Sequence, residues 1–257
     1  MAVPGGEIHC AVAGSGPPVL LLHQTPRSWD EYRDVLPLLG ERFRAIAMDT
    51  IGFGDSSKPP PEEDSIERWA EAAAGLLDAL AIERTAVVGH HTGAVIALEL
   101  AAAFPERIEA AVLSSAPLVD AGYRAAHSGR AVVDEVEPSP DGSHLTELWR
   151  LRQPFYPEGD TDLLERFVVD ALKAGPRAAE GHRVVARYEM DRRLPLVRCP
   201  VLLLAATGDP HAYPSVAALH AALPTSTVIE IPGGMVPLPD QLPHEFAAAV
   251  ADFLTAV

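Results

Sequence analysis

Val87-Val88-Gly89-His90-His91-Thr92-Gly93-Ala94 is the stretch that decides the fold of this chain. An apolar strand pattern runs into G-x-x-x-G, and an alanine-rich helical pattern follows it. Gly89 and Gly93 suit a strand-to-helix turn so tight that a Cβ would collide with a neighbouring strand or helix. The middle residue of such a turn projects alone above the edge of a sheet, and here that residue is His91.

Short apolar runs alternate with helical patterns on both sides of this turn. The alternation predicts a mainly parallel, twisted sheet flanked by helices, which is the α/β class. The runs lack polar alternation, as strands buried on both faces require. The predicted strands are Val19–Leu22, Ala45–Met48, Ala86–Val88, Ala110–Leu113, Val201–Ala205 and Thr227–Ile231. The predicted helices are Ile66–Leu80 with Asp64 or Ser65 as its N-cap, Ala94–Phe104 and Glu245–Leu254.

The segment from about Asp120 to Leu194 has a different character. Aromatic, basic and acidic residues mix there, helical patterns are broken by prolines, and no strand-like run occurs. These helical patterns lie near Leu145–Leu151, Asp162–Ala174 and Ala178–Met190. The segment predicts a helical cap inserted into an α/β core, so the expected division is 1–119, 120–194 and 195–257. Neither G-x-G-x-x-G nor a P-loop is present, so no cofactor is predicted.

Composition narrows the class of partner. The 257 residues include 36 acidic and 20 basic ones, and the net charge of −16 argues against nucleic acid or a membrane surface as partner. No leader pattern precedes Cys10 and no apolar run reaches membrane-spanning length, so a cytoplasmic protein is expected. Cys10 and Cys199 form no disulfide framework and are expected to be reduced and buried. The oligomeric state stays open, a homodimer included.

Five segments, taken in order, resemble the α/β-hydrolase superfamily along essentially the whole chain. In that family the tight turn is the nucleophile elbow, and a catalytic triad follows in the order nucleophile, acid, histidine. The segments are 14–18 leading into 19–26, 49–56, the elbow at 87–94, 203–209 and 231–235. The resemblance implies the α/β-hydrolase fold with a helical cap and a small-molecule substrate.

The resemblance also assigns roles by position, and two of the three triad positions depart from the family pattern. His91 takes the nucleophile's place, where the family has Ser, Asp or Cys, and Asp209 takes the acid's place. Met235 stands where the histidine usually follows a glycine, and His244 comes too late in the chain to replace it. The ordinary Ser-His-Asp acyl transfer therefore does not apply.

The groups that stabilise negative charge match the family better. The N–H of Thr92 follows the elbow residue at a helix N-terminus, and the loop His23-Gln24-Thr25-Pro26 resembles the family's H-G-x-P. Gln24 stands where glycine is usual. The resemblance implies an oxyanion hole formed by the N–H groups of Thr25 and Thr92.

A neutral imidazole, with a reference pKa of about 6.5, acts as a base at neutral pH without an activator, whereas serine needs a histidine partner. His91 is therefore predicted to be a general base in ester or lactone hydrolysis of a small carbonyl substrate. Three alternatives stay open: proton abstraction from carbon in a lyase, isomerase or cyclase, a covalent acyl-imidazole on His91, and a ligand-binding protein without turnover.

The remaining candidates surround this centre. Asp209 is expected to orient His91 or His211, or to bind loop amides, and His211 is expected either to act as a second base or to lie exposed. Among the cap residues, Arg152 or Arg187 is a candidate to hold a carboxylate or enolate. The expected pocket residues are His23, Gln24, His90, Arg152, Tyr156, His211 and Met235, with Met235 as an apolar floor. No metal is predicted, because adjacent histidines such as His90 and His91 point apart and no known ligand spacing occurs.

Overall fold

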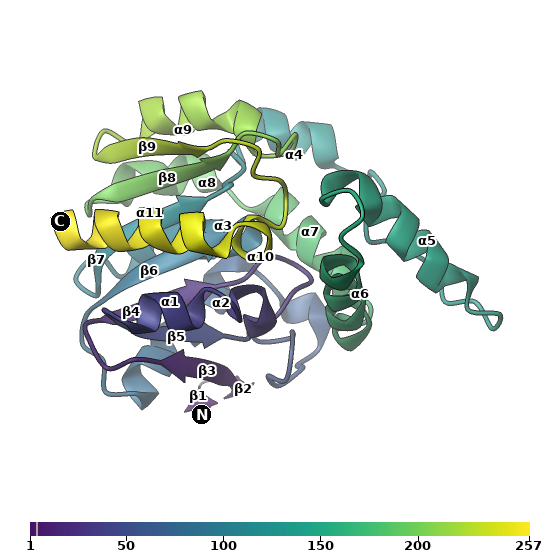
Figure 1. The fold of residues 1–257 in the computed structure, drawn as a ribbon, viewed down its shortest axis with the longest axis horizontal. Coiled ribbons are helices and arrows are strands. Elements are labelled where there is room, and N and C mark those ends of the chain that lie inside the picture. Colours follow the sequence, from purple (N-terminus) through teal and green to yellow (C-terminus); the bar gives the residue numbers. More distant parts are fainter. Residues whose placement is uncertain (4) are drawn as a thin grey trace.

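The computed structural model describes residues 1–3 and 5–257 (Figure 1). Within these residues seven strands form one sheet, in the order β3-β5-β4-β6-β7-β8-β9. Of the seven, β3 pairs antiparallel with β5, and all other neighbours are parallel. The strands are β3 (Cys10–Ala13), β4 (Pro18–Leu22), β5 (Arg44–Met48), β6 (Thr85–His90), β7 (Ile108–Ser114), β8 (Val201–Ala206) and β9 (Ser226–Ile231). The mainly parallel sheet predicted from the apolar runs is confirmed.

Each of the six predicted runs lies within one of the strands β4–β9. The edge strand β3 has no such run, because one of its sides faces solvent and Val12 is 48% exposed. A short two-stranded ribbon, β1 (Ala2–Val3) and β2 (Gly6–Glu7), precedes it. Cys10 and Cys199 are both free, but the expectation that they are buried is only partly met, since each is partly buried against the core.

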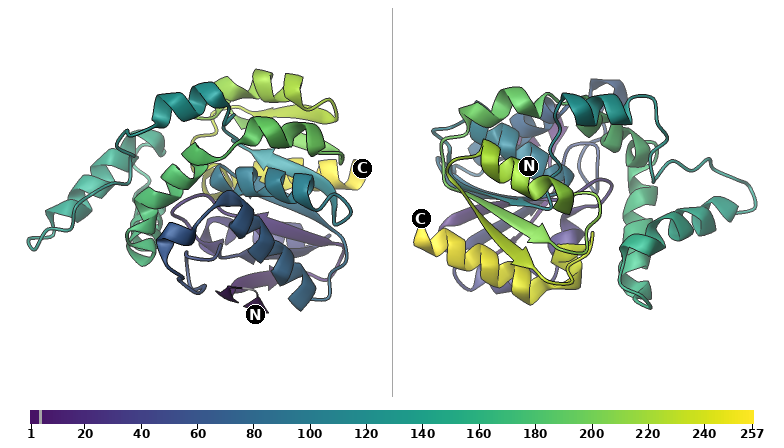
Figure 2. Two further views of the ribbon diagram at one scale, coloured as in Figure 1. Left: turned by 180° about the vertical axis from the view of Figure 1, so that it is seen from behind. Right: turned by 90° about the horizontal axis from the view of Figure 1, so that it is seen from above.

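Helices cover both faces of the sheet (Figure 2). On one face lie α2 (Ile66–Ala79) and α3 (Thr92–Ala103), which pack in one apolar cluster with Leu20, Leu22 and Val87. On the other face lie α1 (Leu36–Gly40) and α11 (Pro243–Ala256), which pack with Val19 and Leu21. Adjacent residues of β4 thus pack in clusters on opposite faces of the sheet, as the alternation of side chains along a strand requires.

The helix starts follow from local capping. Ser65 caps α2 by accepting a hydrogen bond from the Arg68 N–H. Helix α3 is buried on all sides, because it lies between the sheet, α2 and the helices α7 (Arg177–Arg187) and α8 (Met190–Arg193). Its N-terminus therefore opens at the carboxyl edge of the central strands.

The other short elements of the core are η1 (Trp29–Tyr32), η2 (Pro61–Glu63), η5 (Tyr213–Ser215), α9 (Val216–Ala222) and α10 (Leu238–Gln241).

A helical insertion, defined here as helices α4–α8, lies between β7 and β8 in the chain. Figure 1 shows α5 and α6 projecting away from the sheet, with α7 leading back to it. None of the helices in residues 1–3 and 5–257 combines the length and the apolar character needed to span a bilayer. The elements of the insertion are α4 (Ala121–His127), α5 (Ser143–Arg152), η3 (Gln153–Phe155), α6 (Thr161–Ala174), α7 (Arg177–Arg187) and α8 (Met190–Arg193), followed by η4 (Leu194–Leu196).

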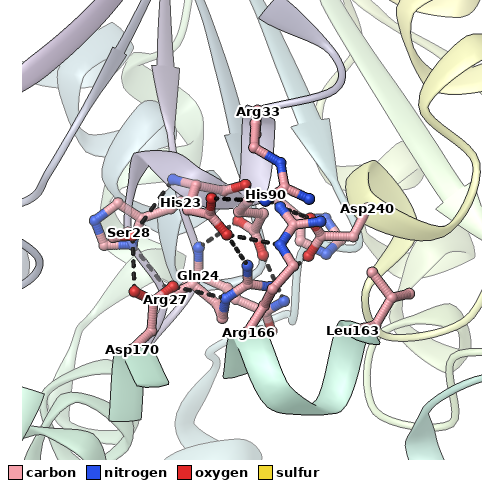
Figure 3. Close-up of polar contacts among 12 residues, drawn as sticks. His23, Gln24, Arg27, Ser28, Arg33, His90, Leu163, Arg166, Asp170 and Asp240 are labelled. Carbon is pink, nitrogen blue, oxygen red and sulfur yellow. Dashed lines mark hydrogen bonds and ion pairs between the residues drawn. The ribbon is translucent and has the colours of Figure 1, made fainter. Parts of the chain in front are cut away.

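A buried ion network joins the insertion to the core (Figure 3). Arg27, in the loop after β4, is fully buried; its Nε donates to Asp170 of α6 at 2.9 Å, and its Nη1 pairs with Asp240 of α10. Ser28 donates a second hydrogen bond to Asp170, and Arg166 of α6 lies 2.7 Å from Asp240. Because these charged side chains are buried away from water, each needs its oppositely charged partners to be stable. The network therefore fixes where α6 lies against the core.

Candidate active site

The turn between β6 and α3 places His91 at its apex. The backbone of His91 has φ +47° and ψ −112°, and residues other than glycine rarely adopt a positive φ. A Cβ on Gly89 would collide with the backbone of Gly93, and a Cβ on Gly93 would collide with the carbonyl of Leu22. Both positions therefore need glycine, and the strain at His91 is imposed by the packing of α3 against the sheet.

His91 meets Asp209 at this edge. The Nε2 of His91 lies 2.7 Å from Oδ2 of Asp209, which follows β8 and is 1% exposed. Neither atom has a partner in hydrogen-bond geometry, so the two atoms are in close polar contact but are not aligned as an in-line hydrogen bond. The other oxygen, Oδ1, accepts the backbone N–H groups of His211 and Ala212 at 2.9 and 3.2 Å. These loop amides orient the carboxylate toward His91.

The charge of Asp209 follows from these contacts. Burial opposes its ionisation, but the neighbouring His91 ring and the His211 N–H outweigh that effect and lower the pKa of the carboxyl. Asp209 is therefore ionised at neutral pH. It faces the one ring nitrogen of His91 that is buried.

His91 lines a cavity of about 280 Å³, and its side chain is 15% exposed. The second ring nitrogen, Nδ1, makes no hydrogen bond to any residue that the structure describes. Nε2 is thus held against Asp209, whereas Nδ1 is the nitrogen available to a molecule in the cavity.

His90 is adjacent in sequence and opposite in environment. It is fully buried, its Nε2 donates to the Val236 carbonyl at 2.7 Å, and its Nδ1 accepts from the Ser114 hydroxyl at 2.9 Å. Burial, with a small effect of the His91 ring, lowers the pKa of His90 to about 4. His90 does not line the cavity. The expectation that it does was wrong, because the side chain of the last strand residue points into the core.

The loop after β4 carries two further candidates. His23 is buried, with Nδ1 bonded to the Gln24 carbonyl and Nε2 accepting the Thr50 N–H, so it orients the loop and does not line the cavity. Gln24 does line it, and both its backbone N–H and its side-chain amide donate to the buried carboxylate of Glu31, at 2.8 and 2.6 Å. The residue that replaces the usual glycine therefore ties this loop to Glu31.

Two backbone N–H groups at the cavity have no acceptor. Thr25 and Thr92 both line the cavity, and neither N–H makes a hydrogen bond to another described residue. That of Thr92 belongs to the first turn of α3, where the helix itself supplies no acceptor. Buried N–H groups are normally paired, so this pair is suited to an oxygen of a bound molecule.

On the insertion side Arg152 and His182 converge on one carboxylate. Arg152 is 3% exposed, and its Nε donates to Asp134 at 2.6 Å while its Nη2 pairs with the other oxygen. His182 donates to the same Asp134 at 2.6 Å. Burial opposes the ionisation of Asp134, but Arg152 and His182 outweigh it and lower its pKa to about 2. Arg152 and His182 line the cavity, and Asp134 lies behind them.

Three more predicted positions lie away from the cavity. Tyr156 is buried, packs edge-on against Phe167 and does not line it. Met235 is not its floor: its side chain lies against Gly208, and Val236 lines the cavity instead. Arg187 is exposed and pairs with Glu180. These side chains are turned away by helix and loop directions that the sequence does not show. His211, by contrast, lines the cavity as an exposed residue at its rim, beside Phe155.

One group has the composition of a metal site. His9, Asp49 and Asp55 offer ligand atoms within 4.8 Å of one another. Asp49, however, already accepts the N–H groups of Trp29 and Asp55, and Asp55 pairs with Lys173. These bonds explain the group as a support for the loop after β5, away from His91.

Comparisons with known proteins identify the fold. The family model described as "alpha/beta hydrolase fold" matches residues 17–168, more than half of the chain. The chain is 36% identical over 118 residues to "Bifunctional epoxide hydrolase 2" of Rattus norvegicus, covering 45% of this chain and 21% of that protein. It is 36% identical over 120 residues to "2-hydroxy-6-oxo-2,4-heptadienoate hydrolase" of Pseudomonas putida, covering 45% and 44%.

Among solved structures, the enol-lactonase from Burkholderia xenovorans LB400 superposes with a TM-score of 0.80 at 22% identity, covering 99% of both chains. At that identity the likeness concerns the fold alone. The match to the curated relatives spans less than half of their length, so their activities are not transferred by it. The family model and the shared fold together show that this chain belongs to the α/β-hydrolase fold family.

Proposed function

We propose that this protein is a cofactor-free hydrolase of small esters or lactones in which His91 is the general base. The observation that carries the proposal is the contact between His91 and Asp209. It holds Nε2 against a buried carboxylate and leaves Nδ1 free in the cavity.

In this mechanism Nδ1 of His91 removes a proton from a water molecule, and the water oxygen attacks the substrate carbonyl. The oxygen that becomes negative is held by the N–H groups of Thr25 and Thr92. The imidazolium then protonates the alkoxide when the carbon–oxygen bond breaks. Asp209 stabilises the imidazolium in between, because an ionised carboxylate lies 2.7 Å from its other nitrogen. The elbow histidine thus stands in the position of the family's nucleophile and also acts as the base, a role that a separate histidine has elsewhere in the family.

The activities for which the relatives are named support a substrate of this kind. They include a lactonase and a hydrolase of an oxo-dienoate, and both share the fold or part of the sequence. We further propose that the insertion is the cap of the active site, since Arg152 and His182 of α5 and α7 line the cavity opposite the core residues. Residues 120–194 would then form the cap between core segments 1–119 and 195–257.

The second candidate is proton abstraction from a carbon next to a carbonyl. The same free Nδ1 and the same pair of N–H groups suit an enolate as well as a tetrahedral oxyanion. A hydrolase incorporates one oxygen of H₂¹⁸O into the acid product, whereas a lyase or isomerase exchanges the substrate α-proton in D₂O. A ligand-binding protein does neither.

The direct test is His91→Ala, measured on p-nitrophenyl esters and a panel of lactones. General-base catalysis contributes about 10²–10⁴-fold, so kcat/KM is expected to fall at least about 100-fold while the fold is kept. The matched control is His244→Ala, an exposed histidine at the start of α11 that has no place in the mechanism. Equal activity of His91→Ala and the parent protein would refute the role of His91.

A further inference from the structure

The cavity in front of His91 differs in charge from the rest of the protein. Among the residues that the structure describes, no aspartate or glutamate lines it, although the chain has 36 acidic and 20 basic residues. The basic side chains that line it are Arg130, Arg152, Arg183, His91, His127, His182 and His211. Because no acidic side chain faces the cavity, a bound anion meets basic donors there and no repelling carboxylate.

Arg152 is the buried part of this lining. Asp134 occupies its Nε and Nη2, and the ring of Phe167 lies 4.6 Å from its Cζ, so the guanidinium is held in one orientation. Its Nη1 donates no hydrogen bond to any described residue, although Arg152 is 3% exposed and lines the cavity. Nη1 is not among the fully buried atoms that lack a partner, so it is open to the cavity, where an oxygen of a ligand can accept its hydrogen bond.

Arg130 is the second group. It lies after α4, at the exposed side of the cavity, and forms no ion pair with any carboxylate of the described residues. Arg183, by comparison, pairs with Glu135 and also lies near Glu180. The carboxylates next to the cavity thus neutralise Arg183 and most of Arg152, and leave Arg130 and the Nη1 edge of Arg152 unsatisfied.

Resting on the function proposed above, we propose that the substrate is itself an anion, a small ester or lactone that carries a carboxylate. The carboxylate binds Arg152 Nη1 and Arg130, and the reacting carbonyl lies between His91 and the N–H groups of Thr25 and Thr92. Arginine suits this role because its planar donors match the two oxygens of a carboxylate. The cavity of about 280 Å³ lies at the lower end of the usual volumes of small-molecule pockets, which suits a small substrate.

The experiment compares p-nitrophenyl hemiglutarate with the p-nitrophenyl ester of monomethyl glutarate, which differ in the terminal carboxylate. The parent protein is expected to hydrolyse the acid at least 10-fold faster, measured as kcat/KM. Arg130→Met is expected to reduce this ratio at least 5-fold. The matched control, Arg187→Met, removes an exposed arginine of α7 outside the cavity and keeps the ratio.

Arg152 needs a milder variant, because Arg152→Met would leave Asp134 buried without its main partner. Arg152→Lys keeps the positive charge but lacks the planar donors, and it is expected to reduce the ratio as well. If the acid and the methyl ester are hydrolysed at equal rates, or if neither variant changes the ratio, the anion site is refuted while the hydrolase proposal stands.

Binding of glutarate separates the two proposals. Glutarate is expected to raise the Tm of the parent protein, since a ligand of the folded state stabilises it, and to raise that of Arg130→Met less. If no ester is hydrolysed but glutarate raises the Tm in this pattern, the anion site is supported and the hydrolase proposal fails. If glutarate has no effect and no preference for the acid is seen, the anion site is refuted.

Discussion

The two sides of the cavity are built in different ways. On the core side, His91, Thr25 and Thr92 are positioned by backbone: by the glycines of the turn, by the start of α3 and by the loop after β4. On the insertion side, Arg152 and His182 are positioned by a shared ion partner, Asp134. The difference shows that a parallel sheet supplies fixed chain ends at its carboxyl edge, whereas an insertion without strands must order its cavity side chains through charge.

The largest effect on stability is expected at Asp134, the carboxylate that orders the insertion side of the cavity. Asp134→Ala leaves the buried guanidinium of Arg152 without a counter-charge, and removal of one partner of a buried pair costs about 3–5 kcal/mol of unfolding free energy. Urea unfolding measures this value. The control is Asp191→Ala, which removes the exposed partner of Arg124 and should cost less than about 1 kcal/mol. Similar losses for both variants would contradict the proposed difference between the two ion pairs.

The core side can be tested through His90, whose pKa is about 4 in the folded protein and about 6.5 in the unfolded chain. The unfolded chain therefore binds more protons between these values, and the stability contribution present above pH 6.5 is lost as the pH falls through about 4. The loss amounts to about 3 kcal/mol, since one pKa unit corresponds to about 1.4 kcal/mol. His90→Gln should flatten the curve of unfolding free energy against pH in this range.

The matched control for that measurement is His244→Gln, which changes an exposed histidine. Its curve should keep the shape of the parent curve. A curve of unchanged slope for His90→Gln would mean that His90 is not the group that makes the core side sensitive to acid.

A smaller effect is expected at Glu31, the carboxylate that holds Gln24 in the loop after β4. Glu31→Gln keeps the shape but removes the charge that receives both donors of Gln24. Loss of such charge-assisted hydrogen bonds is expected to lower kcat about 10-fold with little change in KM, because the Thr25 N–H is less well placed. Faster hydrogen exchange of the Thr25 amide provides a readout independent of activity, and Glu41→Gln is the exposed control. Unchanged exchange at Thr25 would rule out this positioning role.

The core was predictable because its signals are local. Two glycines and an apolar run before them define the turn at His91, and unbroken runs such as Val201–Ala205 are long enough to mark strands. The pairing of Asp209 with His91 was one of the expected alternatives. The insertion was predictable as helical, but neither Asp134 nor Glu31 carries a motif, since each acts through contacts with residues that are separated from it along the sequence.

Side-chain direction was the main source of error. His90 and His91 are identical in type and adjacent in sequence, yet one lies in the core and the other in the cavity, because β6 ends between them. Tyr156 and Met235 were placed in the cavity from their position in the chain, and helix and loop geometry turned both away.

The amino-acid sequence by itself determined the sheet, the tight turn and the identity of the residue at its apex, because these depend on hydrophobic period and on the room that a glycine leaves. Tertiary structure alone decided which ring nitrogen of His91 is free, which of His90 and His91 is buried, and which arginine of the cavity has no carboxylate partner among the described residues. Those properties depend on distances between segments that are far apart in the chain, and such distances exist only once the core and the insertion are packed together.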